Sequence, residues 1–195
     1  MLKPKNKIVK MIKRTTVVLL VVALGAFIYQ KILNRNVGDT IDEFNGIAVH
    51  YNGLDYSKSY GKHYSTEGYY YGKKWQCVEF VKRYYYDYLH HKMPDGSGHA
   101  KSFFDKELKH GEVNKRRNLI QYDNGGNVKP EVNDLLVFDG GYGHVCIISK
   151  VNSAYIEVVQ QNISFQSRTT YQLTNTGSNY LIGTSKKPLG WLRKP

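Results

Sequence analysis

An uncharged, mainly apolar run near the N-terminus constrains this chain most. Thr15 to Tyr29 holds fifteen such residues (TTVVLLVVALGAFIY), and six basic residues but no acidic residue precede it. At about 1.5 Å per residue, the run extended to Leu33 nearly spans the ~30 Å hydrocarbon core of a bilayer. Because apolar residues lie on every face, a buried core helix is disfavoured. We therefore expect a basic cytoplasmic segment at residues 1–14 and a transmembrane anchor at residues 15–33.

A cleaved signal peptide is the alternative interpretation of this run. Its length fits the apolar region of a signal peptide, and Ala23-Leu24-Gly25 resembles a small-x-small cleavage site. In both cases the N-terminal positive charges stay in the cytoplasm, and the chain after about residue 36 is translocated. We expect a single-pass membrane protein with an extracytoplasmic domain or, after cleavage, a secreted protein.

The basic residues are concentrated at the N-terminus. The formal net charge is +12, but residues 1–36 hold eight Lys or Arg and no acidic residue, which leaves 20 basic and 16 acidic residues in the remainder. That remainder carries only about +4, so its charge does not favour nucleic-acid binding. We expect no nucleic-acid partner.

After the apolar run, the sequence predicts a short linker at residues 34–45 and one domain at residues 46–195. Turn residues bound short apolar runs, which predict strands, and the longer segments without Gly or Pro predict helices. Helices are expected at 77–89 and 100–109, a loop at 112–130, and strands at 46–51, 134–138, 144–151, 155–160, 171–173 and within 181–191. One major helix followed by an antiparallel sheet is an α+β layout.

Cys77 stands at the start of the main predicted helix. Apolar and aromatic residues recur from Cys77 along one face, and charged residues occupy much of the other side. A thiol with a pKa of about 8.5 reacts as the thiolate, and both a helix N-terminus and a nearby imidazole favour that anion. Cys77 is therefore a candidate nucleophile, and the alternative is a small buried core residue.

His144 is the candidate base. It follows a glycine turn and opens an apolar strand, whereas the other six histidines lie in polar surroundings, where we expect them to be solvated. No His or Cys cluster has the spacing of metal ligands, so we expect no metal and no cofactor. The chain has one other cysteine, Cys146, and in an oxidising compartment a Cys77–Cys146 disulfide is the alternative to a free nucleophile.

Three motifs carry a family resemblance. They are Trp75–Phe80 (WQCVEF), the Asp134–Leu136 run leading to Gly143-His144-Val145, and Val159–Asn162 (VQQN). In this order they resemble CHAP domains, the papain-like cysteine, histidine-dependent amidohydrolases and peptidases. The chain is similar in particular to the amidase half of glutathionylspermidine synthetase/amidase, which shares WQCVEF and a late Leu-Gly-Trp, here Leu189–Trp191. The resemblance covers residues 46–192.

The resemblance implies a nucleophile helix packed on an antiparallel sheet, with Cys77 as nucleophile and His144 as general base. Relatives often carry Glu where this chain has Gln160, followed two residues later by an Asn that Asn162 matches. An amide oxygen can also accept the imidazole N–H, as an Asn does in papain-like proteases. We therefore expect Gln160 and Asn162 in the catalytic site. Glu157 is excluded, because an odd offset along a strand points it to the opposite face.

The reaction class follows from these expectations. The oxyanion would lie at the Cys77 backbone N–H, with Gln76 as a candidate second donor. Outside a bacterial-type membrane the abundant amide substrate is the peptide of peptidoglycan, so a cell-envelope amidase or peptidase is expected. The alternatives are an amidase for glutathionylspermidine-type polyamine conjugates, whose substrate is cytosolic, and a non-catalytic wall-binding protein, which the neutral Gln160 favours.

Overall fold

The computed structural model describes residues 4–96 and 98–195, with side chains for residues 9–30, 34–96 and 98–195. The chain divides into two units, Met1–Asn36 and Val37–Pro195, each described by itself. The first three residues and the side chains of residues 4–8 and 31–33, which belong to the expected basic segment and anchor, lie outside this description.

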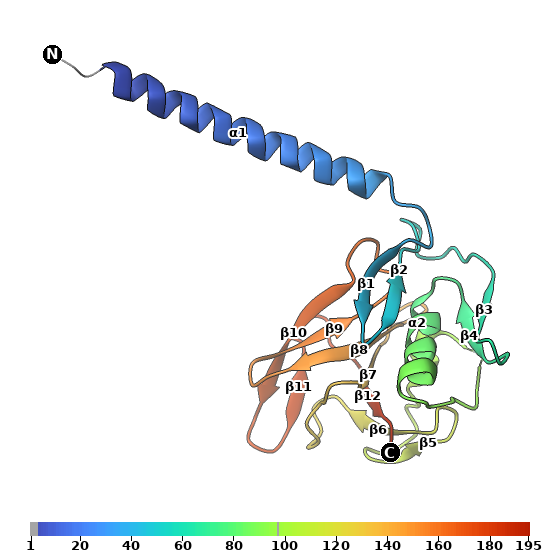
Figure 1. Ribbon diagram of the computed structural model, residues 1–195. Helices are drawn as coiled ribbons and strands as arrows, with labels where there is room; N and C mark the ends of the chain where they lie inside the picture. Colours follow the sequence, from blue (N-terminus) through green and yellow to red (C-terminus); the bar gives the residue numbers. More distant parts are fainter. Residues whose placement is uncertain (1–3, 97) are drawn as a thin grey trace. The chain divides into compact units, whose positions relative to one another are not determined.

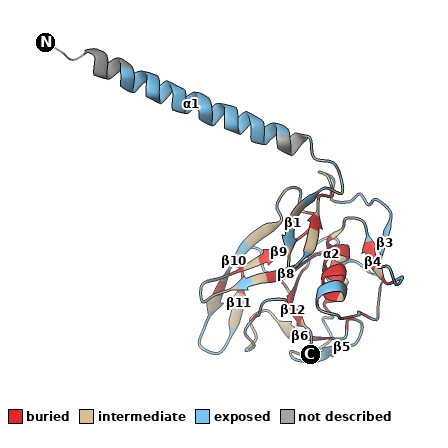
Figure 2. Cartoon of the chain, in the orientation of Figure 1, coloured by how far each residue is buried: buried red, intermediate tan, exposed pale blue. Residues whose placement is uncertain are grey.

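Helix α1 (Pro4–Leu33) forms the first unit. Its stretch Val9–Gln30 has 22 residues and a mean hydropathy of 2.0. At 1.5 Å per residue this stretch is about 33 Å long. By length and composition it can cross a membrane, and a signal sequence near the N-terminus has the same properties. In Figure 2 the described part of this helix has the colour of exposed residues.

An eight-stranded sheet organises the second unit (Figure 1). Its order is β11-β10-β9-β8-β7-β12-β6-β5, and neighbouring strands run antiparallel. The strands are β5 (Val113–Asn114), β6 (Leu119–Asp123), β7 (Leu135–Phe138), β8 (His144–Val151), β9 (Tyr155–Val159), β10 (Arg168–Asn175), β11 (Tyr180–Ile182) and β12 (Gly190–Arg193). The central strands are buried on both faces, so their sequences are nearly continuously apolar.

Side chains of the central strands alternate between two apolar cores. On β7, Leu135 and Val137 join the cluster that includes Phe80 of the main helix, whereas Leu136 and Phe138 join a second cluster. The first core therefore attaches the helix to the sheet. The second core fills the opposite face and contains the fully buried Trp191.

The main helix, α2 (Cys77–Arg83), continues into a π-helical turn, η1 (Tyr84–Tyr88). Two hairpins accompany it: β1 (Thr40–Phe44) pairs with β2 (Ile47–His50), and β3 (Lys62–Tyr64) pairs with β4 (Tyr70–Lys73). The ring of Phe44 stacks on that of Tyr84 at 5.4 Å, which packs the first hairpin on the helix. The expected linker, residues 34–45, thus includes strand β1.

The expected α+β class is confirmed, with a cysteine-bearing helix on an antiparallel sheet. The charged side of that helix, however, is not solvated: Glu79, Lys82 and Arg83 are all buried. Hairpin β3–β4 packs against this side of α2. At Gly72 of β4, a Cβ atom would lie 3.0 Å from the Cα of Glu79, so this close approach favours glycine.

Two local expectations were wrong. Only Ala100–Phe103 of the expected helix 100–109 is helical, as the 3₁₀ turn η2. The next residues extend, and the backbone N–H and C=O of Asp105 bond the side chain of Gln121 at 2.9 and 2.7 Å instead of forming a helical turn. The expected loop 112–130 contains β5 and β6, because Leu119 is buried and β6 pairs with β12.

Candidate active site

Cys77 is the first residue of α2, and its side chain is 7% exposed. Burial raises the pKa of the Cys77 thiol, while backbone N–H groups of Val145, Val78 and Cys77 itself oppose the increase by stabilising the anion. Since Val145 follows His144 on β8, the sulfur lies against the beginning of that strand. The resting cysteine is therefore a thiol rather than a thiolate at neutral pH.

His144 opens β8 after a glycine turn whose geometry is specific. Gly143 has φ +77°, and a Cβ atom there would collide with the backbone of Lys101. The N–H of Lys101 donates to the carbonyl of Tyr142 at 3.2 Å, which joins η2 to this turn. A larger residue than glycine would displace the start of β8, and with it the imidazole.

Gln160 fixes the tautomer of His144. The Gln160 Nε2 donates to Thr169 Oγ1 at 2.8 Å and to the carbonyl of Gln166 at 3.3 Å, so this end of the amide is the nitrogen. Its Oε1 lies 3.0 Å from Nε2 of His144. Because this oxygen can only accept, the imidazole Nε2 carries the proton and Nδ1 keeps its lone pair. The free base of the site is therefore Nδ1.

The imidazole is neutral in the resting site. Burial lowers the pKa of His144 to about 4, the Gln160 hydrogen bond opposes the decrease, and the positive charge of Lys186 adds to it. Cys77, with its raised thiol pKa, and His144, with its lowered imidazole pKa, are therefore both neutral at pH 7. Nucleophilic catalysis with a general base requires such a proton donor and such a proton acceptor.

Asn162 lies on another side of the site. Its Nδ2 donates to Gln76 Oε1 at 2.8 Å and to the carbonyl of Tyr56 at 2.9 Å, and its Oδ1 accepts from Asn52 at 2.7 Å. No hydrogen bond among the described residues joins it to His144. Strand β9 ends at Val159 and Asn162 has φ +69°, so the alternation expected for residues 160 and 162 does not extend this far.

Gln76, the expected second oxyanion donor, is held by the same contacts. Its Nε2 donates to the carbonyls of Tyr56, at 3.2 Å, and Lys58. Both N–H bonds of the amide are therefore engaged with backbone oxygens. In this arrangement the Cys77 backbone N–H is the group that can meet an oxyanion at the start of the helix.

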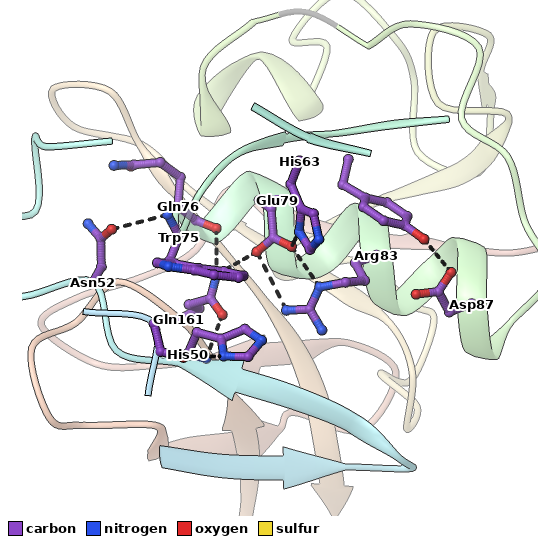
Figure 3. A network of polar contacts seen from close by, with 11 residues as sticks. His50, Asn52, His63, Trp75, Gln76, Glu79, Arg83, Asp87 and Gln161 are labelled. Carbon is purple, nitrogen blue, oxygen red and sulfur yellow. Dashed lines mark hydrogen bonds and ion pairs between the residues drawn. The ribbon is translucent and has the colours of Figure 1, made fainter. Parts of the chain in front are cut away.

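Gln161 connects the segment after β9 to helix α2 (Figure 3). It follows Gln160, is 1% exposed, and donates to the Gln76 carbonyl at 3.1 Å and to Glu79 Oε2 at 2.7 Å. Its Oε1 accepts from the backbone N–H of His50 at 2.7 Å. The polar motif VQQN gave no signal of this role, because nothing in it predicts which amide is buried.

Glu79 is the buried carboxylate of this network. His63 Nδ1 lies 2.8 Å from its Oε1, and Arg83 Nε lies 2.6 Å from the same oxygen (Figure 3). Burial alone would raise the pKa of Glu79, but bonds from His63, Arg83 and Gln161 lower it overall. The carboxylate therefore stays ionised and ties hairpin β3–β4 and the end of β9 to α2.

The expectation of solvated histidines was wrong at four positions, one of which is His110, whose Nδ1 accepts from the backbone N–H of Asp123 at 3.0 Å. His63 bonds Glu79, and the ring of His50 packs on Trp75 with a centroid distance of 4.0 Å. His91 is 6% exposed, and its Nε2 lies 2.9 Å from the carbonyl of Arg117. These histidines are structural, and none of them shares a hydrogen bond with Cys77 among the described contacts.

The second cysteine belongs to the other core. Cys146 points to the same side of β8 as His144 and lies in the cluster with Trp191, whereas Cys77 lies in the cluster with Phe80. Both cysteines are free. Burial raises the pKa of the Cys146 thiol, which makes it unreactive.

No group of three or more His, Cys, Asp or Glu side chains suited to a metal ion occurs among the described residues. A hollow of ≈ 690 Å³ lies at the other end of the helix, lined by Arg83, Asp87, His90 and residues of hairpin β3–β4. It includes neither Cys77 nor His144. The chemistry of the chain is therefore better sought at the start of α2 than in this hollow.

A cysteine-bearing helix packed on one face of an antiparallel sheet defines the papain-like α+β class. Residues 67–162 match the family model of the CHAP domain, a stretch that contains Cys77, His144, Gln160 and Asn162. The match confirms, for these residues, the CHAP resemblance that the motifs predicted. The match indicates amidase or peptidase activity.

The chain is also similar to a longer curated protein. Trypanothione synthetase from Crithidia fasciculata is 30% identical over 98 residues, which cover 48% of this chain. The chain spans only 15% of the length of that relative. The similarity therefore concerns one portion of a much longer protein.

Proposed function

We propose that this protein is a cysteine-dependent amidase or peptidase with Cys77 as nucleophile, His144 as general base and Gln160 as the residue that orients the base. The observation that carries the proposal is the hydrogen bond from His144 Nε2 to Gln160, which leaves Nδ1 as the proton acceptor. The neutral amide of Gln160 orients the imidazole of His144, as a carboxylate does in relatives, but it adds no negative charge.

The first half-reaction transfers the thiol proton of Cys77 to Nδ1 of His144 as the sulfur attacks the carbonyl carbon of the amide. The backbone N–H of Cys77 donates to the developing oxyanion. The tetrahedral intermediate then collapses: the C–N bond breaks, and the imidazolium returns its proton to the leaving amine. The acyl group remains on Cys77 as a thioester.

The second half-reaction restores the thiol. Nδ1 of His144 takes a proton from water as the oxygen attacks the thioester carbonyl. Collapse of this intermediate releases the carboxylic acid, and the sulfur recovers its proton from the imidazolium. Atoms balance as hydrolysis of one amide by one water molecule, with no redox step.

The substrate that we propose is the peptide of peptidoglycan at the cell envelope. The support is topological: six basic residues precede the apolar run, and the positive-inside rule then places residues after α1 outside the cytoplasm. Whether α1 is retained as an anchor or removed as a signal sequence, the catalytic domain would meet the same substrate.

Digestion of peptidoglycan tests this function. The full chain in detergent micelles would be incubated with purified peptidoglycan, and new amino and carboxyl termini would be identified by mass spectrometry. New termini that appear with the parent protein and not with Cys77→Ala support the proposal. If the protein leaves peptidoglycan unchanged but hydrolyses another amide, peptidoglycan is excluded as its substrate.

A polyamine-conjugate amidase is the second candidate, favoured by the similarity to trypanothione synthetase. Such conjugates are cytosolic, so orientation separates the two functions. A reporter fused after Pro195 that works only outside the cytoplasm should be active under the first function. Activity of a cytosol-only reporter at the same position would favour the second.

A further inference from the structure

Lys186, on the loop between β11 and β12, lies over the ring of Phe138, the aromatic neighbour of His144. Its Nζ is 5.6 Å from the centroid of the Phe138 ring, and that ring is 6.4 Å from the ring of His144. Phe138 and His144 are direct partners in the antiparallel register of β7 and β8. The apolar ring therefore holds an ammonium group at the edge of the site.

This ammonium has no acidic partner among the described residues, where no ion pair includes Lys186. Asp139, the residue after β7, already bonds Lys106 at 2.7 Å and also lies in the field of Lys101. The edge of the site next to His144 thus has an excess of positive charge. Lys186 is exposed, so a substrate can reach it.

An unpaired cation at this position opposes protonation of the base. The groups that act on the imidazole are the neutral Gln160 and the cationic Lys186, and the latter helps to lower the pKa of His144. A general base works best when its pKa lies near the working pH, so this arrangement disfavours catalysis in the free enzyme. An anion bound to the ammonium would cancel its field at the ring.

We propose that Lys186 is a specificity-determining residue whose ammonium binds a carboxylate of the substrate next to the scissile amide. The inference rests on the proposed amidase function and deepens it. It names the substrate class: peptides with a free carboxylate, either terminal or on an acidic side chain, beside the bond that is cut. Such a substrate supplies the missing counter-ion and makes His144 more basic in the complex.

Paired peptides test this inference. Two peptides of equal sequence, one with a carboxylate next to the scissile amide and the other with a carboxamide there, would be compared through kcat/KM on the full chain in detergent micelles. A charge-assisted bond predicts a preference of about tenfold or more for the carboxylate. Lys186→Met should abolish the preference, and Lys186→Glu should reverse it. Lys187→Met, the adjacent exposed control, should retain it.

A second measurement is independent of turnover. The imidazole signal of His144 would be titrated by NMR in the parent protein and in Lys186→Met, where loss of the positive charge should move the titration to higher pH. The carboxylate peptide should produce the same upward shift in the parent protein only. An equal preference in Lys186→Met and the parent protein, or a His144 titration that neither change moves, would overturn the inference. A preserved titration effect without any amide turnover would reject only the proposed function.

Discussion

The Nε2 atom of His144 and the Oε1 atom of Gln160 lie 3.0 Å apart, and the donors of the same amide are occupied by Thr169 and Gln166. The amide cannot rotate by 180° without placing its nitrogen against the imidazole N–H and its oxygen against a carbonyl. The base of the proposed reaction is thus selected by three hydrogen bonds to a neutral side chain.

Gln160→Glu should shift the acid limb of the pH profile of kcat/KM to higher pH. In the free enzyme this limb reports loss of the imidazolium proton of His144, whose pKa is lowered to about 4. An adjacent carboxylate stabilises the imidazolium and raises its pKa by about 1–3 units. Gln160→Ala should instead lower kcat/KM without an upward shift, because the ring loses its orientation. Identical profiles for Ala and Gln at this position would assign orientation of the ring to another residue.

Gln160→Glu should also lower the free energy of unfolding. A glutamate at position 160 faces the carbonyl of Gln166 with an oxygen and loses the donor that satisfies it. Loss of this part-buried hydrogen bond should cost about 0.5–1.5 kcal/mol. Urea unfolding of Gln160→Glu at neutral pH measures this loss. Equal midpoints for the variant and the parent protein would contradict the hydrogen-bond arrangement described for Gln160.

The resting thiol of Cys77 should react slowly with alkylating agents at pH 7. Burial raises its pKa, so the thiolate becomes abundant only at alkaline pH. Iodoacetamide labelling followed by mass spectrometry from pH 6 to pH 10 should show labelling of Cys77 that increases with pH. Cys146, buried in the other core, should label only after unfolding. Faster labelling of Cys146 than of Cys77 in the native protein would exclude Cys77 as the reactive thiol.

Glu79→Ala should cost about 3–5 kcal/mol in the free energy of unfolding, because it leaves the buried Arg83 without its carboxylate. The control Glu107→Ala removes an exposed carboxylate and should change stability by less than about 0.5 kcal/mol. Urea unfolding at pH 7 compares the two variants. If Glu79→Ala lowers the free energy of unfolding no more than the control does, the hydrogen bonds of Glu79 do not stabilise helix α2.

The lowered pKa of Glu79 also predicts that the protein becomes less stable in acid. Its folded-state pKa lies below the unfolded value of 4.5, so the folded state binds fewer protons there. The stabilisation is present above about pH 4.5 and is lost as pH falls through the folded-state pKa. Urea midpoints of the parent protein should fall between pH 5 and pH 3, and those of Glu79→Gln should fall less. Parallel curves would assign acid sensitivity to other carboxyl groups.

The sequence predicted the parts of this molecule that follow from periodicity. Cys77 at the start of a helix and His144 at the start of an apolar strand could be located because each begins a periodic segment after turn residues. Strands β7, β8 and β9 could be located in the same way, whereas β5 and β6 lie in a segment that was predicted to be a loop. The match of residues 67–162 to the CHAP family agrees with the motifs that carried the resemblance.

The polar interior could not be predicted in the same way. Glu79, Arg83 and Gln161 have side chains that single-sequence patterns assign to the surface. Segments distant in the sequence, such as hairpin β3–β4 and strand β2, supply contacts that bury them. The position of Asn162 also depends on where β9 ends. Long-range contacts decide these features, since residues far apart in sequence supply each partner.

Trapping of the covalent intermediate would test directly whether Cys77 is the nucleophile. The full chain in detergent micelles would be mixed with an activated amide substrate, quenched in acid within milliseconds to seconds, and digested for mass spectrometry. The account predicts an acyl group on Cys77 that hydroxylamine removes, and that is absent from Cys77→Ala and strongly reduced in His144→Ala. Acylation of any other residue, or amide turnover by Cys77→Ala at the rate of the parent protein, would contradict it.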